Sequence, residues 1–215
     1  MTDTAAARPV TEQTRGTEHS RGRPRSEAAD QAILTATLRS LASVGFAGTT
    51  MSGIAREAGV STATLYRRYD GIIAVVIDAL ASQSPDRPVP DTGSLRHDLA
   101  LYLDRLTAFL ASRRGGSLLS ALLDEAGRNP ELADALYVNI SRPARDHLAT
   151  VFLRAIERGE ARGDLDVDLA IDMAVGPLYV RRLEAVRPFE PDLPVRLAHM
   201  VAAAVQSERP DSESP

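Results

Sequence analysis

The sequence predicts an all-α protein, and two observations carry that prediction. Apolar residues recur at spacings of three and four along most of the 215 residues, whereas no stretch alternates convincingly as a β-strand does. Capping residues, glycines and prolines divide these periodic stretches into segments of ordinary helix length. Because the chain has only four Phe, five Tyr and no Trp, we expect a core built mainly from Ala, Leu, Val and Ile.

The first helix is expected over about residues 26–44. Ser26 can cap its start, Gly45 can end it, and Phe46 can fold back on its last turn. Its buried stripe would consist of Ile33, Leu34, Leu38 and Leu41.

Residues 49–69 follow the pattern of two short helices joined by a turn that begins with glycine. Thr50 can cap the first helix, because its hydroxyl can accept a hydrogen bond from a free backbone N–H. Gly59 stands where that helix must stop, and glycine takes the left-handed conformation there at least cost. Ser61 can cap the second helix, and Leu65 falls on its buried side. This is the layout of a helix-turn-helix, whose second helix can enter the major groove of DNA.

The outward face of that second helix would carry Thr62, Ala63, Tyr66 and Arg67. Small residues let a helix approach base edges closely, while tyrosine and arginine suit phosphate or guanine contacts. The alternative is an ordinary helical hairpin with a polar outer face. Since capping, glycine and cationic surface coincide within one short span, the pattern favours a DNA-binding regulator.

Everything after this motif is also expected to be helical. A fourth helix would cover about residues 71–80, before a proline-containing loop over residues 84–93. The expected boundaries beyond the loop are a Ser94 cap, a break at Gly115-Gly116, a start at Asn129-Pro130, kinks at Pro143 and Pro177, a stop at Gly163, a start at Asp166 or Asp168, and a last helix over about residues 193–206.

This order predicts four regions. They are a disordered basic arm (1–25), a three-helix helix-turn-helix DNA-binding domain with the following helix (26–80), a helical ligand-binding and dimerisation domain (81–207), and a disordered tail (208–215). Within the arm, Arg21-Gly22-Arg23-Pro24-Arg25 resembles the core of an AT-hook, so Arg21, Arg23 and Arg25 could lie extended in a narrow minor groove. The alternative is a flexible basic leader that adds only non-specific attraction.

The net charge of −4 is unevenly distributed. Residues 1–80 hold nine Arg and eight acidic residues, whereas the remainder holds sixteen Arg and twenty-one acidic residues. We expect the acidic part to face away from DNA. All 25 cationic side chains are arginine, so every phosphate contact would use a planar group that can bind two oxygens.

The sequence also argues against several classes of site. Without cysteine there is no disulfide and no thiolate zinc site, and no apolar run approaches the roughly 18 residues of a membrane span. We expect a cytoplasmic protein without a membrane partner or cofactor. No nucleophile elbow or glycine-rich phosphate loop supports catalysis, so an enzyme is not expected. Two scattered groups do not match metal sites and are better explained by packing, surface positions and helix capping: His19, His97, His147 and His199, and Asp164, Asp166, Asp168 and Asp172.

Candidate ligand and dimer residues lie in the C-terminal part. Pockets in helical bundles are built from facing side chains, and plain core packing is the alternative for each candidate. The dimer interface is expected on the last two helices, through the stripe Leu197, Val201 and Val205. The pocket candidates are His97, Tyr102, Phe109, Tyr137, His147, Phe152, Met173 and Tyr179.

Several of these motifs together resemble the tetracycline-repressor (TetR) family. In the helix-turn-helix they are Thr50, Ile54-Ala55, Gly59-Val60-Ser61, Leu65-Tyr66 and Tyr69. Outside it they are the leader Gly22-Arg23-Pro24-Arg25, the pair Gly45-Phe46, and the later segment Gly176-Pro177-Leu178-Tyr179. The resemblance implies a homodimer of all-α subunits, each with a three-helix DNA-binding head and a larger ligand-binding body. In that family, ligand in the body shifts the two heads apart and releases the operator.

The resemblance also implies residue roles. Thr50, Tyr66, Arg67 and Arg68 would contact phosphate, and Arg67 is also the best candidate for a base contact. Thr62 and Ala63 would lie nearest base edges, next to the Ser61 cap, and Tyr69 would pack against the first and fourth helices. The family usually opens its fourth helix with Ser-Lys, but here Ile72 stands where the lysine is expected. We therefore expect weaker operator affinity and about one fewer released counterion.

The sequence thus predicts a ligand-responsive, homodimeric transcriptional repressor acting on double-stranded operator DNA. The rival interpretation is a helical sensor or protein-interaction module of the same fold with weak or lost DNA binding.

Overall fold

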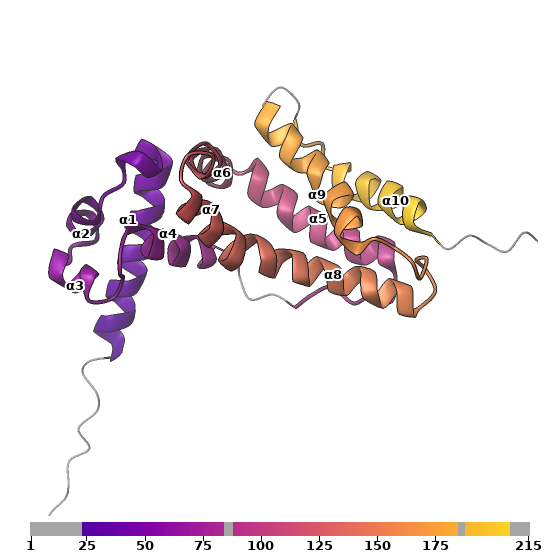
Figure 1. The fold of residues 1–215 in the computed structure, drawn as a ribbon, viewed down its shortest axis with the longest axis horizontal. Helices are drawn as coiled ribbons and strands as arrows, with labels where there is room; N and C mark the ends of the chain where they lie inside the picture. The colour runs from indigo at the N-terminus through magenta and orange to yellow at the C-terminus, as the bar shows by residue number, and fades with distance from the viewer. Residues whose placement is uncertain (1–22, 84–87, 185–187, 207–215) are drawn as a thin grey trace, which may run out of the picture.

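The computed structural model describes residues 23–83, 88–184 and 188–206, and every regular element in these ranges is a helix, which confirms the all-α fold class (Figure 1). Arg21 and the predicted tail (208–215) lie outside the described residues. No helix in the described ranges combines the length and apolar character needed to cross a bilayer. The elements are α1 (Arg23–Gly48), α2 (Met51–Ala58), α3 (Thr62–Tyr66), α4 (Ile72–Ala81), α5 (Leu95–Ala111), α6 (Arg113–Ala126), α7 (Pro130–Leu136), the π-helical turn η1 (Tyr137–Ser141), α8 (Arg142–Glu157), α9 (Val167–Glu184) and α10 (Leu193–Val205).

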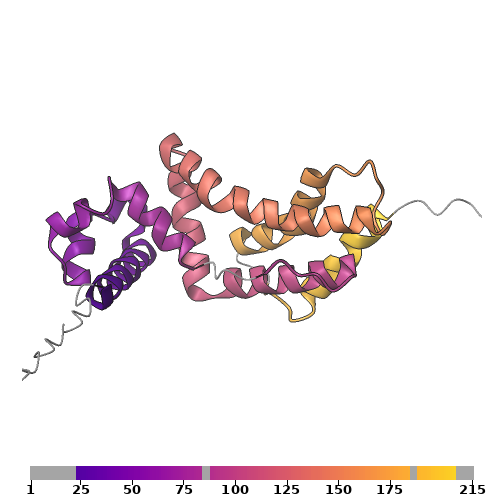
Figure 2. The ribbon, with the colours of Figure 1, turned by 90° about the horizontal axis from the view of Figure 1, so that it is seen from below.

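The molecule is elongated, with a head and a body. Figures 1 and 2 show α1–α4 together at one end, α5 and α8–α10 at the other, and α6 and α7 between them. Three apolar clusters match this division. The head core joins α1–α4 through residues that include Ile33, Ile54 and Leu65, whereas the body core joins α5, α8, α9 and α10.

The third cluster connects head and body, and we call it the joint cluster. It combines residues of α1 and α4 with residues of α6 and α7, so it belongs to both parts of the molecule. Its buried members are Leu38, Leu41, Phe46, Val76, Ala79, Leu80, Leu118, Leu122 and Leu132.

One predicted helix start and one predicted break need correction. α1 begins at Arg23 instead of Ser26; its span continues to Gly48, but Gly45, with a φ of 71°, interrupts the helical path at the position where the sequence predicts an end. The expected break at Gly115-Gly116 is wrong, because both glycines lie inside α6. The break comes at Ser112, whose Oγ caps α6 by accepting from the Gly115 N–H at 3.0 Å.

Other boundaries follow the predicted capping chemistry. Asn129 caps α7 and Asp166 caps α9, each through its side-chain oxygen, at 3.1 and 3.0 Å from a backbone nitrogen. Pro143 has no N–H to donate, and the chain before it widens into η1. Pro177 lies inside α9.

The predicted Ser94 cap of α5 is wrong, because a distant residue takes that role. Ser94 makes no side-chain cap bond; instead the Leu95 N–H donates to Oε2 of Glu160 at 2.8 Å, from the loop after α8. Arg158 Nε donates to the other carboxylate oxygen at 2.5 Å. Burial opposes ionisation of Glu160, but these two hydrogen bonds outweigh it and lower the pKa of its carboxyl group.

We expect Glu160→Ala to lower the free energy of unfolding by about 1 kcal/mol at pH 7, because α5 loses its cap. Since the folded pKa of Glu160 is depressed, this contribution is complete above the ordinary glutamate value of 4.5 and is lost as pH falls through the folded value. Urea unfolding of both proteins from pH 7 to below pH 4 measures the difference. A gap between wild type and variant that stays constant with pH would contradict the assignment.

Candidate nucleic-acid interface and effector body

The turn between α2 and α3 has the geometry that the sequence predicts. Thr50 is extended and its Oγ1 accepts from the Gly53 N–H at 3.1 Å. Gly59 has a φ of 68°, and the N–H groups of Gly59 and Val60 donate to carbonyl oxygens of α2 at 3.3 and 3.0 Å. This paired arrangement ends α2, turns the chain and gives partners to the carbonyls of Ala55 and Arg56.

The short helix α3 is anchored on one side and open on the other. Ser61 caps it by accepting from the Thr64 N–H at 3.1 Å, and Leu65 is fully buried in the head core. The predicted outward residues are all exposed: Thr62, Ala63, Tyr66 and Arg67. Tyr66 is 57% exposed, so a large ring projects from the helix at the outer end of the head. This face can meet base edges with its small residues and phosphates with its longer ones.

Tyr69 and Arg68 hold α3 against the rest of the head. The Tyr69 hydroxyl donates to Oδ2 of Asp78 on α4 at 2.7 Å, and burial followed by this bond raises the pKa of Tyr69 well above its usual range. Arg68 is paired with Asp30 on α1, and its side chain is only 24% exposed. The structure therefore directs Arg68 towards α1, unlike Arg67, and the phosphate contact expected of Arg68 is not available while this pair holds.

Ile72 opens α4 at the position where a lysine was expected. Its side chain is half-buried and packs against both the head core and the joint cluster. The residue thus contributes apolar contacts between the two clusters, which gives a structural reason for an isoleucine there. The expectation of weaker operator affinity stays a prediction.

The candidate minor-groove arm is only partly described. Arg21 lies outside the described residues, and the side chains of Arg23 and Arg25 are likewise outside them. The backbone of Arg23 and Arg25 is helical, as the first turn of α1. The extended backbone expected for an AT-hook is therefore not the conformation at these two residues.

The pocket candidates do not gather at one site. Phe152 is fully buried in the body core, whereas Phe109, Tyr137, His147 and Met173 are exposed. Tyr102 and Tyr179 do come together inside the body, and burial, with the nearby Tyr179, raises the pKa of Tyr102 to about 12. The Tyr102 hydroxyl donates to the Ala144 carbonyl oxygen at 3.0 Å, which ties α5 to α8.

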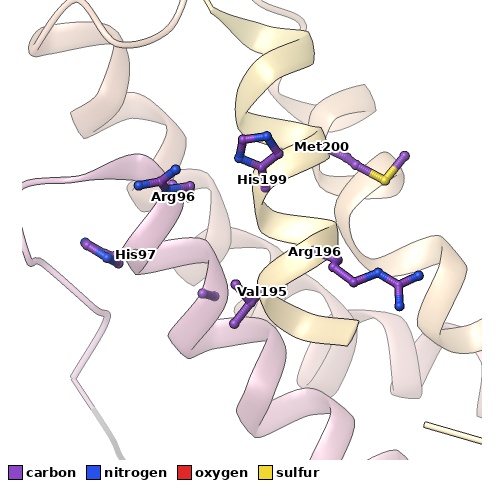
Figure 3. A pocket seen from close by; sticks show the side chains of 7 residues that line it. Arg96, His97, Val195, Arg196, His199 and Met200 are labelled. Atoms are coloured by element: carbon purple, nitrogen blue, oxygen red, sulfur yellow. The ribbon is translucent and has the colours of Figure 1, made fainter. Parts of the chain in front are cut away.

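His97 lies in a shallow groove between α5 and α10. The groove has a volume of about 590 Å³ and opens to solvent, and Figure 3 shows that its side chains come from both helices. Its lining residues are Arg96, His97, Ala100, Val195, Arg196, His199 and Met200. Among the described residues, no three His, Cys, Asp or Glu side chains are placed to hold a metal ion.

The stripe predicted for the dimer interface faces the interior of its own subunit. Leu197, Val201 and Val205 are 7%, 3% and 2% exposed and pack in the body core of their own subunit, against α5. They were the most periodic apolar residues of α10, but periodicity does not say which surface covers them. The exposed apolar residues of the last two helices are instead Leu169, Met173, Val180 and Leu183 on α9, and Val195 and Met200 on α10.

Two family models cover the head and the body separately. The model described as bacterial regulatory proteins of the tetR family matches residues 33–77, which span the helix-turn-helix. The model described as a tetracyclin repressor-like C-terminal domain matches residues 89–201. The chain belongs to the TetR family of transcriptional regulators. It is thus a DNA-binding regulator of the helix-turn-helix type, in a family that is not enzymatic.

Two relatives and one solved structure are similar to most of the chain. An uncharacterized regulator of Bacillus subtilis, YdeS, is 36% identical and aligns with 76% of this chain and 82% of its own. The DNA-binding transcriptional repressor TetR of Mycobacteroides abscessus is 30% identical, over 73% of this chain and 83% of its own. The crystal structure of B. subtilis FadR with stearoyl-CoA shares the fold, with a TM-score of 0.65 at 20% identity, over 80% of this chain and 95% of its own.

Arg67 is exposed whereas Arg68 is paired with Asp30, and this difference gives a test of the interface. Arg67→Ala is expected to weaken binding to the chain's own upstream DNA about tenfold or more, and to lower the slope of log affinity against log salt by about one. Arg68→Ala should leave that slope unchanged, because Arg68 is paired with Asp30. Fluorescence anisotropy over a salt series measures both, with Arg196→Ala in the body as control. Equal slope changes for the two head variants would show that the Arg68 pair opens on DNA.

Proposed function

We propose that this protein is a homodimeric repressor that a small-molecule effector releases from its operator. The helix-turn-helix carries this proposal, because its exposed recognition face lies on a separate head while the larger body offers the surfaces for a second subunit and an effector. The M. abscessus relative is named a repressor, and FadR was crystallised with stearoyl-CoA, which supports repression and effector binding at the level of the family.

Dimerisation would use the exposed apolar face of α9 together with α10. Leu169, Met173, Val180 and Leu183 are 44–58% exposed and follow one another at spacings of four, seven and three, so they share one side of α9. Val195 and Met200 on α10 are 58% and 68% exposed. Two copies of such a face can form an isologous four-helix interface, and a twofold dimer would present two heads to successive major-groove half-sites.

The dimer surface is tested by placing a charge in the middle of the stripe. Met173→Asp should give a monomer by light scattering at micromolar concentration, because an unpaired carboxylate would have to be buried in the interface. The same variant should lose most of its operator affinity, since each head alone contacts half of the site. Leu153→Asp on α8, where Leu153 is 51% exposed, is the matched control and should remain dimeric. If the Met173→Asp protein is dimeric, the interface lies on another surface.

The regulatory function is tested on the intact chain with its own upstream DNA. Salt-dependent, sequence-selective binding is expected in fluorescence anisotropy, with a stoichiometry of two subunits per site. A screen of small molecules against that complex should yield a compound that lowers operator affinity at least tenfold. Binding without sequence preference would instead support the rival interpretation of a sensor that has lost its operator.

A further inference from the structure

Arg182 stands out among the half-buried arginines of the body. In the described part of the chain, Arg145 pairs with two aspartates of α9, Arg154 with Asp91 at 3.4 Å, and Arg181 with Glu190 at 2.9 Å. Arg182 is half-buried like these three, but it has neither an ion pair nor a hydrogen bond there, and its Nε is buried without a partner. A guanidinium in such a position loses hydration without gaining a counter-charge.

The guanidinium of Arg182 occupies a place that only glycine leaves open. It lies on α6 at Gly116, where an added Cβ would come within 2.1 Å of Cζ. An alanine at residue 116 would therefore force the Arg182 side chain to move. The packing between α9 and α6 is thus adapted to hold this cation at a defined position.

A second unpartnered polar group closes the same end of the body core. On α9, Arg182 continues the buried stripe of Ile171, Ala174 and Leu178; on α5, Thr107 continues that of Leu99 and Leu103. Thr107 is 8% exposed, and its Oγ1 has no hydrogen-bond partner among the described residues.

The register of α5 and α9 brings these two polar residues to one end. Tyr102 and Tyr179 interact, and α6 begins directly after α5 and meets Arg182 near the end of α9. The two helices therefore run in the same direction. About one turn after the tyrosine pair, α5 carries Thr107 and α9 carries Arg182.

We propose that Arg182 and Thr107 bind the anionic oxygens of an amphiphilic effector that bears a carboxylate or a phosphate. The guanidinium and the hydroxyl supply hydrogen bonds to the anion, and the anion supplies the charge that Arg182 lacks. The buried residues that precede Arg182 and Thr107 on these helices are apolar, so an effector that enters between α5 and α9 would meet apolar side chains with its apolar portion. This inference deepens the proposed function, on which it rests, by naming the effector's chemical class and its anchor.

The site is placed to reach the head through α6. While Gly116 carries Arg182, Leu118 and Leu122 of the same helix belong to the joint cluster with α1 and α4. Figure 1 shows α6 between the head and the remaining body helices. An anion that draws the guanidinium off Gly116 changes the packing of α6, and with it the position of the head relative to the body.

The test measures anion binding to the DNA-free, full-length protein. The probes are sodium octanoate and octyl phosphate, with 1-octanol as the neutral molecule of equal chain length. Isothermal titration gives each affinity, and the ¹⁵N–¹H signal of the Arg182 Nε, assigned by its loss in Arg182→Gln, reports contact directly. The variants are Arg182→Gln and Gly116→Ala, and Arg181→Gln is the control because it removes the same charge one residue away.

At least one of the two anions is expected to bind the wild type and shift the Arg182 Nε signal, whereas 1-octanol leaves that signal in place. Arg182→Gln should weaken anion binding about tenfold or more, and Arg181→Gln should change it less than twofold. Gly116→Ala displaces the guanidinium as the anion does, so it should bind the anion at least as tightly as the wild type. Without anion, Arg182→Gln should unfold at the same or a higher temperature than the wild type. A structural ion pair would give the opposite shift.

Failure of both anions to bind the wild type, or equal anion binding by Arg182→Gln, overturns the proposal. Because no DNA is present, this result is independent of operator binding. If only neutral compounds release the operator, the proposed function is still supported, but the proposed anion site at Arg182 and Thr107 is wrong.

Discussion

The apolar contact of α6 and α7 with α1 and α4 is the interaction on which the rest of this structure depends. Burying one Leu or Val side chain contributes about 1.5–3 kcal/mol, and the joint cluster buries nine apolar residues from both parts of the molecule. A cluster of that size couples head and body firmly, because neither can move far without exposing these side chains. Any signal that reaches the recognition helix from the body must pass through this contact or through the α4–α5 connection.

The helices of the head could be predicted because their boundaries depend on contacts between residues close together in the sequence. Thr50, Gly59 and Ser61 each fix a backbone conformation by a bond or a positive φ that depends on nearby residues, so their spacing alone predicts two helices and their turn. The exposure of α3's outer face follows from the burial of Leu65. What escaped prediction in the head are contacts between distant residues, such as the pairing of Arg68 with Asp30, which no local pattern announces.

The body shows why the same reasoning fails beyond the element level. Periodicity placed Leu197, Val201 and Val205 on one face of α10, but only the tertiary structure shows that α5 of the same subunit covers that face. Likewise Ser94 is a reasonable cap by sequence, yet Glu160 takes its place from 65 residues away. The large side chains proposed for a pocket are divided between core and surface, since size and polarity do not determine which helix faces which. The spacing of Leu169, Met173, Val180 and Leu183 places them on one face of α9, but spacing does not show whether another helix covers that face.

The energetic scale of one charge-assisted contact suits the role proposed for Arg182. A hydrogen bond to a charged group contributes about 1.5–3 kcal/mol, which corresponds to roughly 10- to 150-fold in an equilibrium constant. Coupling between effector and operator cannot exceed the difference in effector affinity between the two head positions. A guanidinium that rests on Gly116 with no counter-charge from the described residues in one position, and meets an anion in the other, provides a difference of that size. The same residue in a stable ion pair would be satisfied in both positions and could not favour one of them.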